Sequence, residues 1–440
     1  MTTGQNESGL VLFPPTAEVN EKSHLVIGGC DTMALAEEFG TPLYVFDEVT
    51  LRRKCTEFRD EFGRRYQDTA IVYACKAFVN RALALLFKEE GLGLDVVSGG
   101  ELSIARSVDF PMEKVYFHGN NKSAEELGMA LEYKVGRIVI DNFQELDTLA
   151  EIAGQRGATP DVLLRLTPGV DPHTHKHIST GVVDSKFGIP LASAGEAVAR
   201  AMSAPNLNLI GLHFHLGSQI FEVEPYREAI RVIMDLVAEM KSKHGFELQE
   251  LDVGGGFAVQ YTVDAPAPPV SDYAEVIVTT VNEKCREHSL GLPKLVIEPG
   301  RAIVGRAGVA LYEVGVVKDI PGVRRYVSVD GGMADNIRPA LYGARYEAVV
   351  ASKMNDKAAK KVTIVGKFCE SGDILIKDID LPEIAVGDIL AVPDCGAYCL
   401  AMGSNYNVSL KPAIVLVNGG KARLIRRRET YEDLLRCDLV

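Results

Sequence analysis

The 440-residue sequence lacks the cysteine spacing of a disulfide scaffold or a zinc site. Its eight cysteines are scattered, and no Cys-x-x-Cys pair occurs among them. No apolar run is long enough to cross a bilayer, and the polar N-terminal stretch MTTGQNESGL has no signal-peptide pattern. We therefore expect reduced thiols and a cytoplasmic protein.

Basic residues are also too few to build a strongly positive surface. Lysine and arginine number 47 against 60 acidic residues, which gives a formal net charge of -13. Nucleic acids and anionic membranes attract basic surfaces, so we expect neither as a main partner. A chain of this length predicts two domains, and its hydrophobic content of 47% is that of a globular enzyme.

What the sequence does contain is a series of eight short apolar runs separated by amphipathic helical stretches. The runs are rich in β-branched residues and leucine, as in strands that are buried on both faces. They are residues 70–77, 93–98, 114–119, 137–142, 161–168, 207–217, 248–256 and 294–301. Eight such βα repeats predict an α/β fold with a (β/α)8 barrel over residues 48–305, with a doubly wound sheet as the alternative.

The texture changes after residue 306, where short β-type runs are broken by Gly, Pro and Asp. This pattern predicts a separate C-terminal β-rich domain over residues 306–440. The N-terminal segment 24–47 contains SHLVIGGC and is expected to join that β domain. Residues 1–23 are expected to form a flexible lead-in.

Lys76 stands at the end of the first apolar run, AIVYACKA, where a lysine is costly to bury. It either extends its amine to solvent or serves as a reactive amine. Active sites of (β/α)8 barrels form at the C-terminal ends of the strands. The polar residues at those ends are Lys76, Ser98, His118, Arg165, His215, Gly254 to Gly256, and Glu298 with Arg301. Their convergence on one rim favours a function for Lys76.

Two further features at these strand ends indicate a phosphate-bearing cofactor. The run DVGGGF exposes backbone N–H groups that suit a phosphate, although a tight turn would also need glycine. Glu298 either pairs with an arginine or keeps the ring nitrogen of a cofactor protonated. A lysine amine, a phosphate cradle and an inward carboxylate together describe a site for pyridoxal 5'-phosphate.

Histidines recur at a spacing of two in GLHFHLGSQ and in DPHTHKH. Such pairs can bind zinc, but there is no His-Glu-x-x-His motif and the HxH of a barrel hydrolase would belong on the first strand. We expect no metal. A histidine that stacks on a cofactor ring accounts better for His215.

The predicted second domain has chemical candidates of its own. Cys369 lies beside Glu370 and is either a buried structural cysteine or a reactive one. Arg338 and Tyr342 are four residues apart, so a helical turn would place them on one face, where they suit a carboxylate.

The motifs YACKA, GLGLDVVSGGEL, HFHLGSQ, DVGGGF, EPGR, CESGD and GAY…SNYN follow one another in this order. From about residue 25 to the end, the chain resembles the diaminopimelate decarboxylases. These are fold type III pyridoxal-phosphate decarboxylases with an alanine-racemase-like barrel and a C-terminal β domain. The stretch VDPHTHKHISTGVVDSKFGI also resembles this family rather than its ornithine or arginine branches.

The resemblance implies a role for each matching residue. Catalytic roles fall to Lys76, which carries the cofactor, to Cys369, the proton donor, and to His215, which stacks on the ring. The implied cofactor contacts are Lys76, His215, Ser218, Gly254, Gly255, Gly256, Glu298, Gly300, Arg301 and Tyr398. The implied substrate contacts are Arg301, Arg338, Tyr342, Glu370 and Tyr398. In the family, Cys369 and Glu370 reach the site from the other subunit, so a homodimer with shared active sites is implied.

The activity implied by the resemblance is decarboxylation of meso-2,6-diaminopimelate to L-lysine and CO2, the last step of lysine biosynthesis. Three alternatives stay open. A decarboxylase of arginine or ornithine would share nearly every cofactor residue. A non-catalytic pyridoxal-phosphate carrier would resemble the barrel alone, and a metal-dependent barrel hydrolase would need a metal.

Overall fold

The computed structural model describes residues 10–171 and 185–440. The chain divides into two compact units. The barrel unit comprises Lys54–Ala258 and Ala267–Gly300, and the second unit comprises Met1–Arg53, Val259–Pro266 and Arg301–Val440. The boundaries expected from sequence, at residues 48 and 305, lie within a few residues of this division. The short excursion Val259–Pro266 leaves the barrel unit between two of its strands, which the sequence did not predict.

Eight parallel strands close into a barrel in the order β5-β6-β7-β8-β9-β11-β12-β13, with β13 paired back to β5. They are β5 (Thr69–Ala74), β6 (Gly93–Val96), β7 (Val115–Phe117), β8 (Arg137–Ile140), β9 (Asp161–Thr167), β11 (Asn208–Phe214), β12 (Glu250–Asp252) and β13 (Lys294–Ile297). Seven fall inside one of the eight predicted runs, and β5 begins one residue before its run, so the predicted (β/α)8 barrel is confirmed and the doubly wound alternative is wrong. A ninth, two-residue strand, β10 (Ile189–Pro190), pairs with β9.

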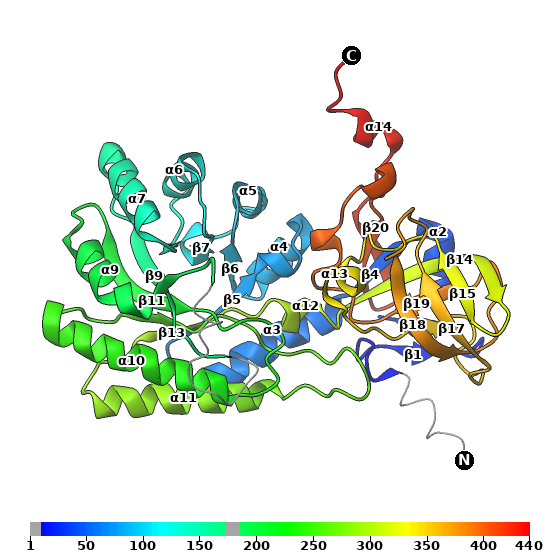
Figure 1. The fold of residues 1–440 in the computed structure, drawn as a ribbon, viewed down its shortest axis with the longest axis horizontal. Helices are drawn as coiled ribbons and strands as arrows, with labels where there is room; N and C mark the ends of the chain where they lie inside the picture. Colours follow the sequence, from blue (N-terminus) through cyan, green and yellow to red (C-terminus); the bar gives the residue numbers. More distant parts are fainter. Residues whose placement is uncertain (1–9, 172–184) are drawn as a thin grey trace. The chain divides into compact units, whose positions relative to one another are not determined.

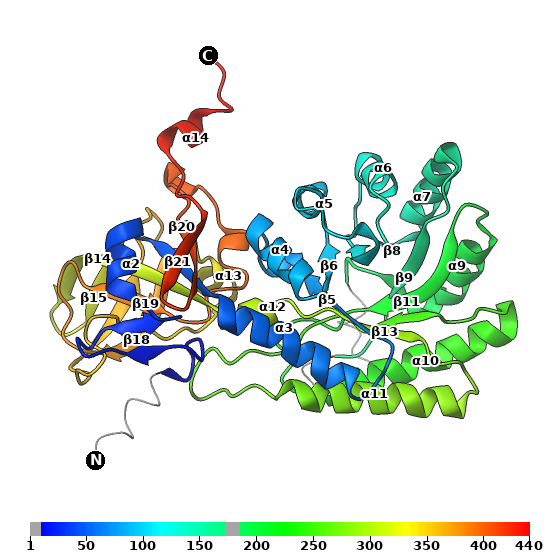
Figure 2. The same ribbon diagram turned by 180° about the vertical axis from the view of Figure 1, so that it is seen from behind.

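Helices cover the outside of the barrel (Figure 1); α3 precedes the first barrel strand, and the others follow strands. They are α3 (Glu48–Gly63), α4 (Arg81–Glu89), α5 (Gly99–Arg106), α6 (Ala124–Glu132), α7 (Phe143–Arg156), α9 (Leu191–Ser203), α10 (Glu224–His244) and α11 (Val270–Glu287). Figures 1 and 2 both show α10 and α11 side by side. Four of the helices begin at Asn or Ser N-caps just after a strand end, namely Asn80, Ser98, Ser123 and Asn142.

The interior of the barrel is a packed core rather than a channel. One buried cluster joins Val72, Tyr116 and Val296, and another joins Val139, Leu163 and Ile210. Strands that are apolar on both faces bury these side chains against one another. Polar side chains are therefore concentrated at the strand ends, where the sequence predicts the site.

The second unit is built on a mixed β-sheet in the order β18-β17-β15-β14-β4-β20-β21. The strands are β4 (Leu43–Asp47), β14 (Gly308–Ile320), β15 (Arg324–Val329), β17 (Lys360–Val365), β18 (Ile374–Leu381), β20 (Ala413–Asn418) and β21 (Lys421–Arg426). Two short strands, β16 (Val349–Val350) and β19 (Ile389–Val392), pair with each other, and β19 also pairs with β14. Strand β4 lies between β14 and β20, so the segment before residue 48 is part of this sheet.

The N-terminal residues differ from the expected flexible lead-in from residue 10 onward. Leu12 and Phe13 are buried, and Phe13 packs into the core of the second unit. Strand β1 (Glu18–Val19) pairs with β2 (Leu25–Ile27), which pairs with β3 (Cys30–Asp31) and leads into helix α2 (Thr32–Phe39). The sequence signal was weak because only two large apolar residues anchor this stretch, and the strands are very short.

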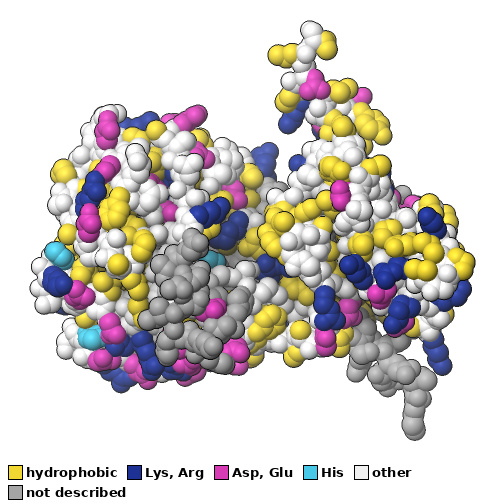
Figure 3. All heavy atoms as spheres, in the orientation of Figure 1, with side chains coloured by type: hydrophobic (Ala, Val, Ile, Leu, Met, Phe, Trp, Pro, Cys, Tyr) yellow, Lys and Arg dark blue, Asp and Glu magenta, His cyan; other side chains and the backbone are white. Residues whose placement is uncertain are grey.

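The surface of the barrel unit carries both signs of charge. Figure 3 shows Lys and Arg side chains interspersed with Asp and Glu over its helices. Charge of one sign therefore does not dominate the face in view. None of the helices in residues 10–171 and 185–440 combines the length and apolar character of a membrane span.

Candidate functional site

Lys76 follows strand β5 in a single 3-10 turn, η1 (Cys75–Ala77). Its Nζ donates a hydrogen bond to Oδ2 of Asp95 at 2.8 Å. Asp95 lies in strand β6 and is fully buried, whereas the side chain of Lys76 is 35% exposed. The amine is thus held at the rim by a buried carboxylate while one side stays open to an incoming molecule.

A second lysine in the barrel unit shows what a purely structural lysine looks like. The Nζ of Lys122 donates to Glu145 at 2.6 Å and to the carbonyls of Gly119 and Val139 at 2.8 Å each. Its side chain is only 1% exposed. All three N–H donors of Lys122 have acceptors and no solvent reaches them, so Lys76 is the better candidate for a reactive amine.

Glu298 follows strand β13 and is buried against two imidazoles. Its Oε1 lies 2.7 Å from Nε2 of His118, and its Oε2 lies 3.4 Å from Nε2 of His213. Burial alone would raise the pKa of Glu298, but the adjacent imidazoles lower that pKa well below its ordinary value. Burial lowers the pKa of His213 to about 3, so His213 is neutral.

Asp252, at the end of β12, completes this buried group. Burial, together with the charge of Glu298, raises the pKa of Asp252 well above its ordinary value. Two neighbouring carboxyl groups cannot both ionise cheaply, and the opposite shifts of their pKa values favour the negative charge on Glu298. The pair therefore offers a buried negative charge, which is the partner that a protonated ring nitrogen requires.

The same four side chains offer ligand atoms that lie within 4.8 Å of one another: His118, His213, Asp252 and Glu298. Geometry alone would allow a metal ion there. An N–H donor of a cofactor ring needs only the Glu298 carboxylate, so the same geometry also suits a cofactor ring.

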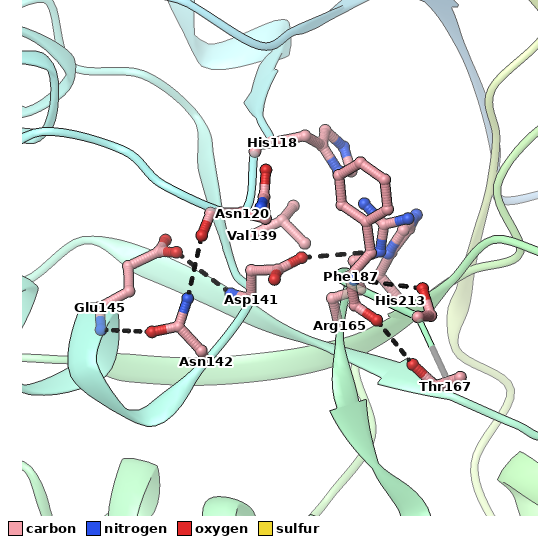
Figure 4. A network of polar contacts seen from close by, with 12 residues as sticks. His118, Asn120, Val139, Asp141, Asn142, Glu145, Arg165, Thr167, Phe187 and His213 are labelled. Carbon is pink, nitrogen blue, oxygen red and sulfur yellow. Dashed lines mark hydrogen bonds and ion pairs between the residues drawn. The ribbon is translucent and has the colours of Figure 1, made fainter. Parts of the chain in front are cut away.

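An arginine network lies behind this group (Figure 4). The Nε of Arg165 is 3.8 Å from Oδ1 of Asp141, and its guanidinium lies 4.5 Å from the ring centre of Phe187. The hydroxyl of Thr167 donates to the carbonyl of Phe187 at 2.8 Å and fixes that ring. Burial lowers the pKa of Arg165, and its charge acts on both Glu298 and His215. Figure 4 shows His118 and His213 close to this arginine.

The three glycines after β12 are packed too closely for side chains. A Cβ on Gly255 would lie 2.1 Å from the carbonyl oxygen of Glu298, and Gly254 and Gly256 have positive φ angles of 70° and 107°. The N–H of Gly254 donates to Asp252, and that of Gly255 donates to Nδ1 of His215. These bonds place His215 beside the loop and leave fewer amides for a phosphate than the sequence predicted.

His215 follows strand β11, and its bond to Gly255 fixes the direction of the imidazole. Burial, with the nearby cations of Lys76 and Arg165, lowers its pKa well below the ordinary value. A neutral, oriented imidazole suits stacking on an aromatic ring. Ser218 lies in the exposed loop that follows. Gly300 lies against the first strand, since a Cβ there would meet Ala74 and Ala77 at 3.0 to 3.2 Å.

In the second unit, Arg301 begins helix α12 (Arg301–Val304) and faces two tyrosines. Its Nη1 donates to the hydroxyl of Tyr261 at 2.8 Å, and its guanidinium lies 4.5 Å from the ring centre of Tyr398. Tyr398 has a φ of 59°, an unusual backbone conformation for a residue with a side chain. Such strain is tolerated where a side chain must be aimed, as at functional sites.

Arg338 begins the short helix α13 (Arg338–Tyr342) and is buried. Its guanidinium lies 4.3 Å from the ring centre of Tyr261 and donates to the hydroxyl of Tyr346. Tyr342, at the other end of the helix, is 63% exposed. The predicted helical turn is present, but within this unit the partners of Arg338 are Tyr261 and Tyr346.

Cys369 and Glu370 lie in the loop between β17 and β18, and Cys369 is exposed. The backbone N–H of Cys369 donates to Asn407 at 2.9 Å, and its carbonyl accepts from the hydroxyl of Tyr406 at 3.2 Å. A carboxylate oxygen of Glu370 accepts from the N–H of Gly372 at 3.1 Å. The thiol is thus exposed on a loop whose backbone is held in place, which excludes the interpretation of Cys369 as a buried structural cysteine.

Sequence reasoning missed three residues of this site: Asp95, Tyr261 and Tyr346. Asp95 is an acid inside an apolar strand, and that exception was a usable signal. Tyr261 and Tyr346 lie in irregular segments without periodicity, so nothing local marked them. The histidines of DPHTHKH lie outside the described residues.

Comparisons with known proteins identify relatives over the whole chain. Residues 48–305 match the family described as pyridoxal-dependent decarboxylase, pyridoxal binding domain. The diaminopimelate decarboxylase of Bacillus subtilis is 47% identical over 96% of this chain and 97% of its own. That of Mycobacterium tuberculosis is 44% identical over 97% and 98%. The crystal structure of the M. jannaschii diaminopimelate decarboxylase in complex with L-lysine has a TM-score of 0.91 and 37% identity, covering 97% of this chain and 98% of that one.

Proposed function

The chain belongs to the diaminopimelate decarboxylase family, and from that premise we propose which of its residues carry the reaction. The reaction is the pyridoxal-phosphate-dependent decarboxylation of meso-2,6-diaminopimelate to L-lysine and CO2, the last step of lysine biosynthesis. The enzyme is a carboxy-lyase. The observation that carries the residue assignments is the burial of the Glu298 carboxylate against two imidazoles at the barrel rim.

The residues at the rim fit the cofactor. Although His118 Nε2 lies 2.7 Å from Glu298 Oε1, neither atom makes an aligned hydrogen bond in the described residues, so this oxygen can accept from a ring N–H. Lys76 provides the amine for covalent attachment, and His215 provides a ring to stack. Ser218, Gly256, Gly300 and Arg301 are proposed to surround the phosphate. When bound, the cofactor accepts the electron pair that departing CO2 leaves behind.

The chain's own groups control the protons of the reaction. The pKa values of Glu298 and Asp252 are shifted in opposite directions, which favours the negative charge on Glu298, and we propose that this charge stabilises a protonated ring nitrogen. Asp95 keeps the amine of Lys76 at the rim. The carbon that loses CO2 must gain one proton, and we propose that the thiol of Cys369 donates it.

The far end of the substrate carries a second amino and carboxylate pair. We propose that Arg338 and Tyr342 contact this carboxylate, that Glu370 contacts the ammonium, and that Tyr398 and Arg301 line the same site. Ornithine and arginine have no second carboxylate and would leave the buried guanidinium of Arg338 without its anion, which costs affinity. This separates the proposed substrate from those of the alternative decarboxylases.

A decarboxylation assay tests this function. Purified protein with added cofactor is offered meso-diaminopimelate, L-lysine, L-ornithine and L-arginine, and the released CO2 is measured. We expect turnover of meso-diaminopimelate with the other three at least about a hundredfold slower, because each leaves a buried donor unpaired. If ornithine or arginine were decarboxylated faster than meso-diaminopimelate, that amino acid would be the substrate and the proposal would be wrong.

The family's arrangement also supports a homodimer in which Cys369 and Glu370 serve the site of the other subunit. We propose this assembly, together with a cytoplasmic location, which the eight free cysteines support. Mixing inactive Lys76→Ala protein with inactive Cys369→Ala protein tests the shared site. After subunit exchange has been demonstrated, random pairing gives about a quarter of the wild-type activity, by counting intact sites. Activity that stays at the parental level after exchange means that each site lies within one chain.

A further inference from the structure

The excursion Val259–Pro266 leaves the barrel directly after the glycine run and packs in the second unit. It is tied there to the segment that follows helix α13. The N–H of Val263 donates to Glu347 at 2.9 Å, and Asp264 pairs with Arg345 at 3.2 Å. These contacts fix the position of Tyr261, which the excursion carries.

Tyr261 lies between the two arginines. Its hydroxyl accepts from Arg301 at 2.8 Å, while the guanidinium of Arg338 lies 4.3 Å from its ring centre. Tyr346 packs edge-on against the same ring, with ring centres 5.3 Å apart at 82°, and its hydroxyl accepts from Arg338. The sulfur of Cys399 lies 3.5 Å from the Tyr346 hydroxyl.

Arg338 is only 6% exposed, yet no carboxylate in residues 10–171 and 185–440 lies within ion-pair distance of it. The buried Asp394 acts on Arg338 electrostatically from farther away. A buried guanidinium ordinarily pairs with an acid, because an uncompensated buried charge costs several kcal/mol. Two tyrosines contact the guanidinium: its centre lies 4.3 Å from the ring centre of Tyr261 and 5.3 Å from that of Tyr346, and it donates to the Tyr346 hydroxyl. This arrangement stabilises the cation while leaving its other N–H donors for an external anion.

We propose that Tyr261 and Tyr346 are positioning residues that aim Arg338 at the substrate's second carboxylate. The inference rests on the proposed function, since Arg338 is taken to bind that carboxylate. The two tyrosines touch the arginine and not the reacting atoms. Their loss therefore weakens binding of ligands that carry the distal carboxylate and leaves the chemical step almost unchanged.

Two ligands isolate this effect, because they differ only in that carboxylate. L-Lysine keeps the carboxylate that the reaction leaves behind, whereas cadaverine is the same diamine without it. We therefore measure equilibrium binding of both to the holoenzyme by calorimetry, for the wild type and for Tyr346→Phe. The variant removes one hydroxyl and keeps the ring. Tyr66→Phe is the matched control, since Tyr66 is a buried tyrosine in the barrel unit that donates to the carbonyl of Pro293.

The wild type is expected to bind L-lysine more tightly than cadaverine. Tyr346→Phe is expected to weaken L-lysine binding about tenfold, by loss of one hydrogen bond to a charged group, with cadaverine unchanged. KM for meso-diaminopimelate rises by a similar factor, while kcat changes less than about twofold. Tyr66→Phe leaves the L-lysine to cadaverine ratio at the wild-type value.

If Tyr346 had only a structural role, Tyr346→Phe would weaken the binding of L-lysine and cadaverine equally, or would lower cofactor occupancy. Either result overturns the inference. So does a wild type that binds L-lysine and cadaverine equally. Binding is measured without turnover, so a wild type that releases no CO2 from meso-diaminopimelate contradicts the proposed function by a separate observation.

Discussion

The two units of the chain treat buried charge differently. At the barrel rim, Glu298 lies against His118 and His213, and Lys76 lies against Asp95, so each ionised group has a partner of complementary chemistry. In the second unit, Arg338 lies against Tyr261 and Tyr346 and forms no ion pair with a carboxylate of the described residues, although the buried Asp394 acts on it electrostatically from a greater distance. The difference indicates a division of labour, in which the barrel sets the electronics of a resident cofactor and the second unit holds a cation for a ligand's anion.

The largest effect is expected from replacing Lys76, the proposed reactive amine of the barrel unit. Within residues 10–171 and 185–440, Lys76 is the only rim lysine that pairs with a buried carboxylate and keeps a partly exposed side chain, so Lys76→Ala is expected to lose covalent cofactor attachment. Turnover is expected to fall by more than about 10³-fold. Borohydride reduction followed by peptide mass spectrometry locates the attached cofactor. Lys114→Ala, a change at an exposed lysine in the same unit, should retain both label and activity. A label on another lysine of the wild type contradicts the assignment.

Glu298→Gln tests the buried anion itself. The amide keeps the shape of the side chain but removes the charge that stabilises a protonated ring nitrogen. We expect kcat to fall roughly a hundredfold while cofactor occupancy, read from absorbance, stays near the wild-type value. An unchanged kcat with full occupancy would show that the barrel does not tune the cofactor through this residue.

Arg338→Lys tests the unpaired cation of the second unit. Lysine keeps the charge but cannot lie flat on the Tyr261 ring or present a planar fork to a carboxylate. KM for meso-diaminopimelate is expected to rise about tenfold with little change in kcat. Steady-state kinetics under cofactor saturation measure both parameters. Loss of kcat at constant KM would assign Arg338 to the chemistry rather than to binding.

Glu101→Gln tests a buried acid of the barrel unit whose hydrogen bonds do not fully offset the cost of burying its charge. Burial, with the charge of Asp95, raises the pKa of Glu101 to about 7, against a bond from the Val97 N–H that lowers it. Between the ordinary carboxyl pKa and 7, the folded protein binds a proton that the unfolded chain releases, so stability falls as pH rises through this window.

A glutamine side chain does not ionise, so it removes this loss of stability at high pH. At pH 8 we expect Glu101→Gln to be more stable than the wild type by about 1–3 kcal/mol, whereas near pH 4.5 the two should agree. Urea unfolding of the holoenzymes at several pH values measures the difference. A stability difference that does not depend on pH would attribute the effect to packing instead of ionisation.

The sequence predicted the barrel half of the site better than the other half. Strand ends in a (β/α)8 barrel converge on one rim, so runs such as AIVYACKA and KLVIEPGR located Lys76 and Glu298 without any knowledge of contacts. Asp95 was overlooked although an acid inside an apolar strand was a usable signal, because only its contact with Lys76 shows what the acid does.

The second unit gave fewer local signals, and its contacts are mostly non-local. Tyr261 and Tyr346 are 85 positions apart and meet only because the excursion crosses into the second unit. Helical spacing correctly predicted the turn of Arg338 and Tyr342 but not that one end would be buried and the other exposed. No periodicity encodes an irregular loop that packs against another irregular loop.

The division of labour between the units is tested most directly by combining Glu298→Gln with Arg338→Lys in one chain. We measure kcat and KM for meso-diaminopimelate in the two single variants and the double variant, all saturated with cofactor. If the barrel controls the chemistry and the second unit controls binding, the double variant shows the lowered kcat of the first parent and the raised KM of the second. A double variant whose kcat falls well below that of Glu298→Gln alone contradicts the division, because Arg338 would then act on the chemical step.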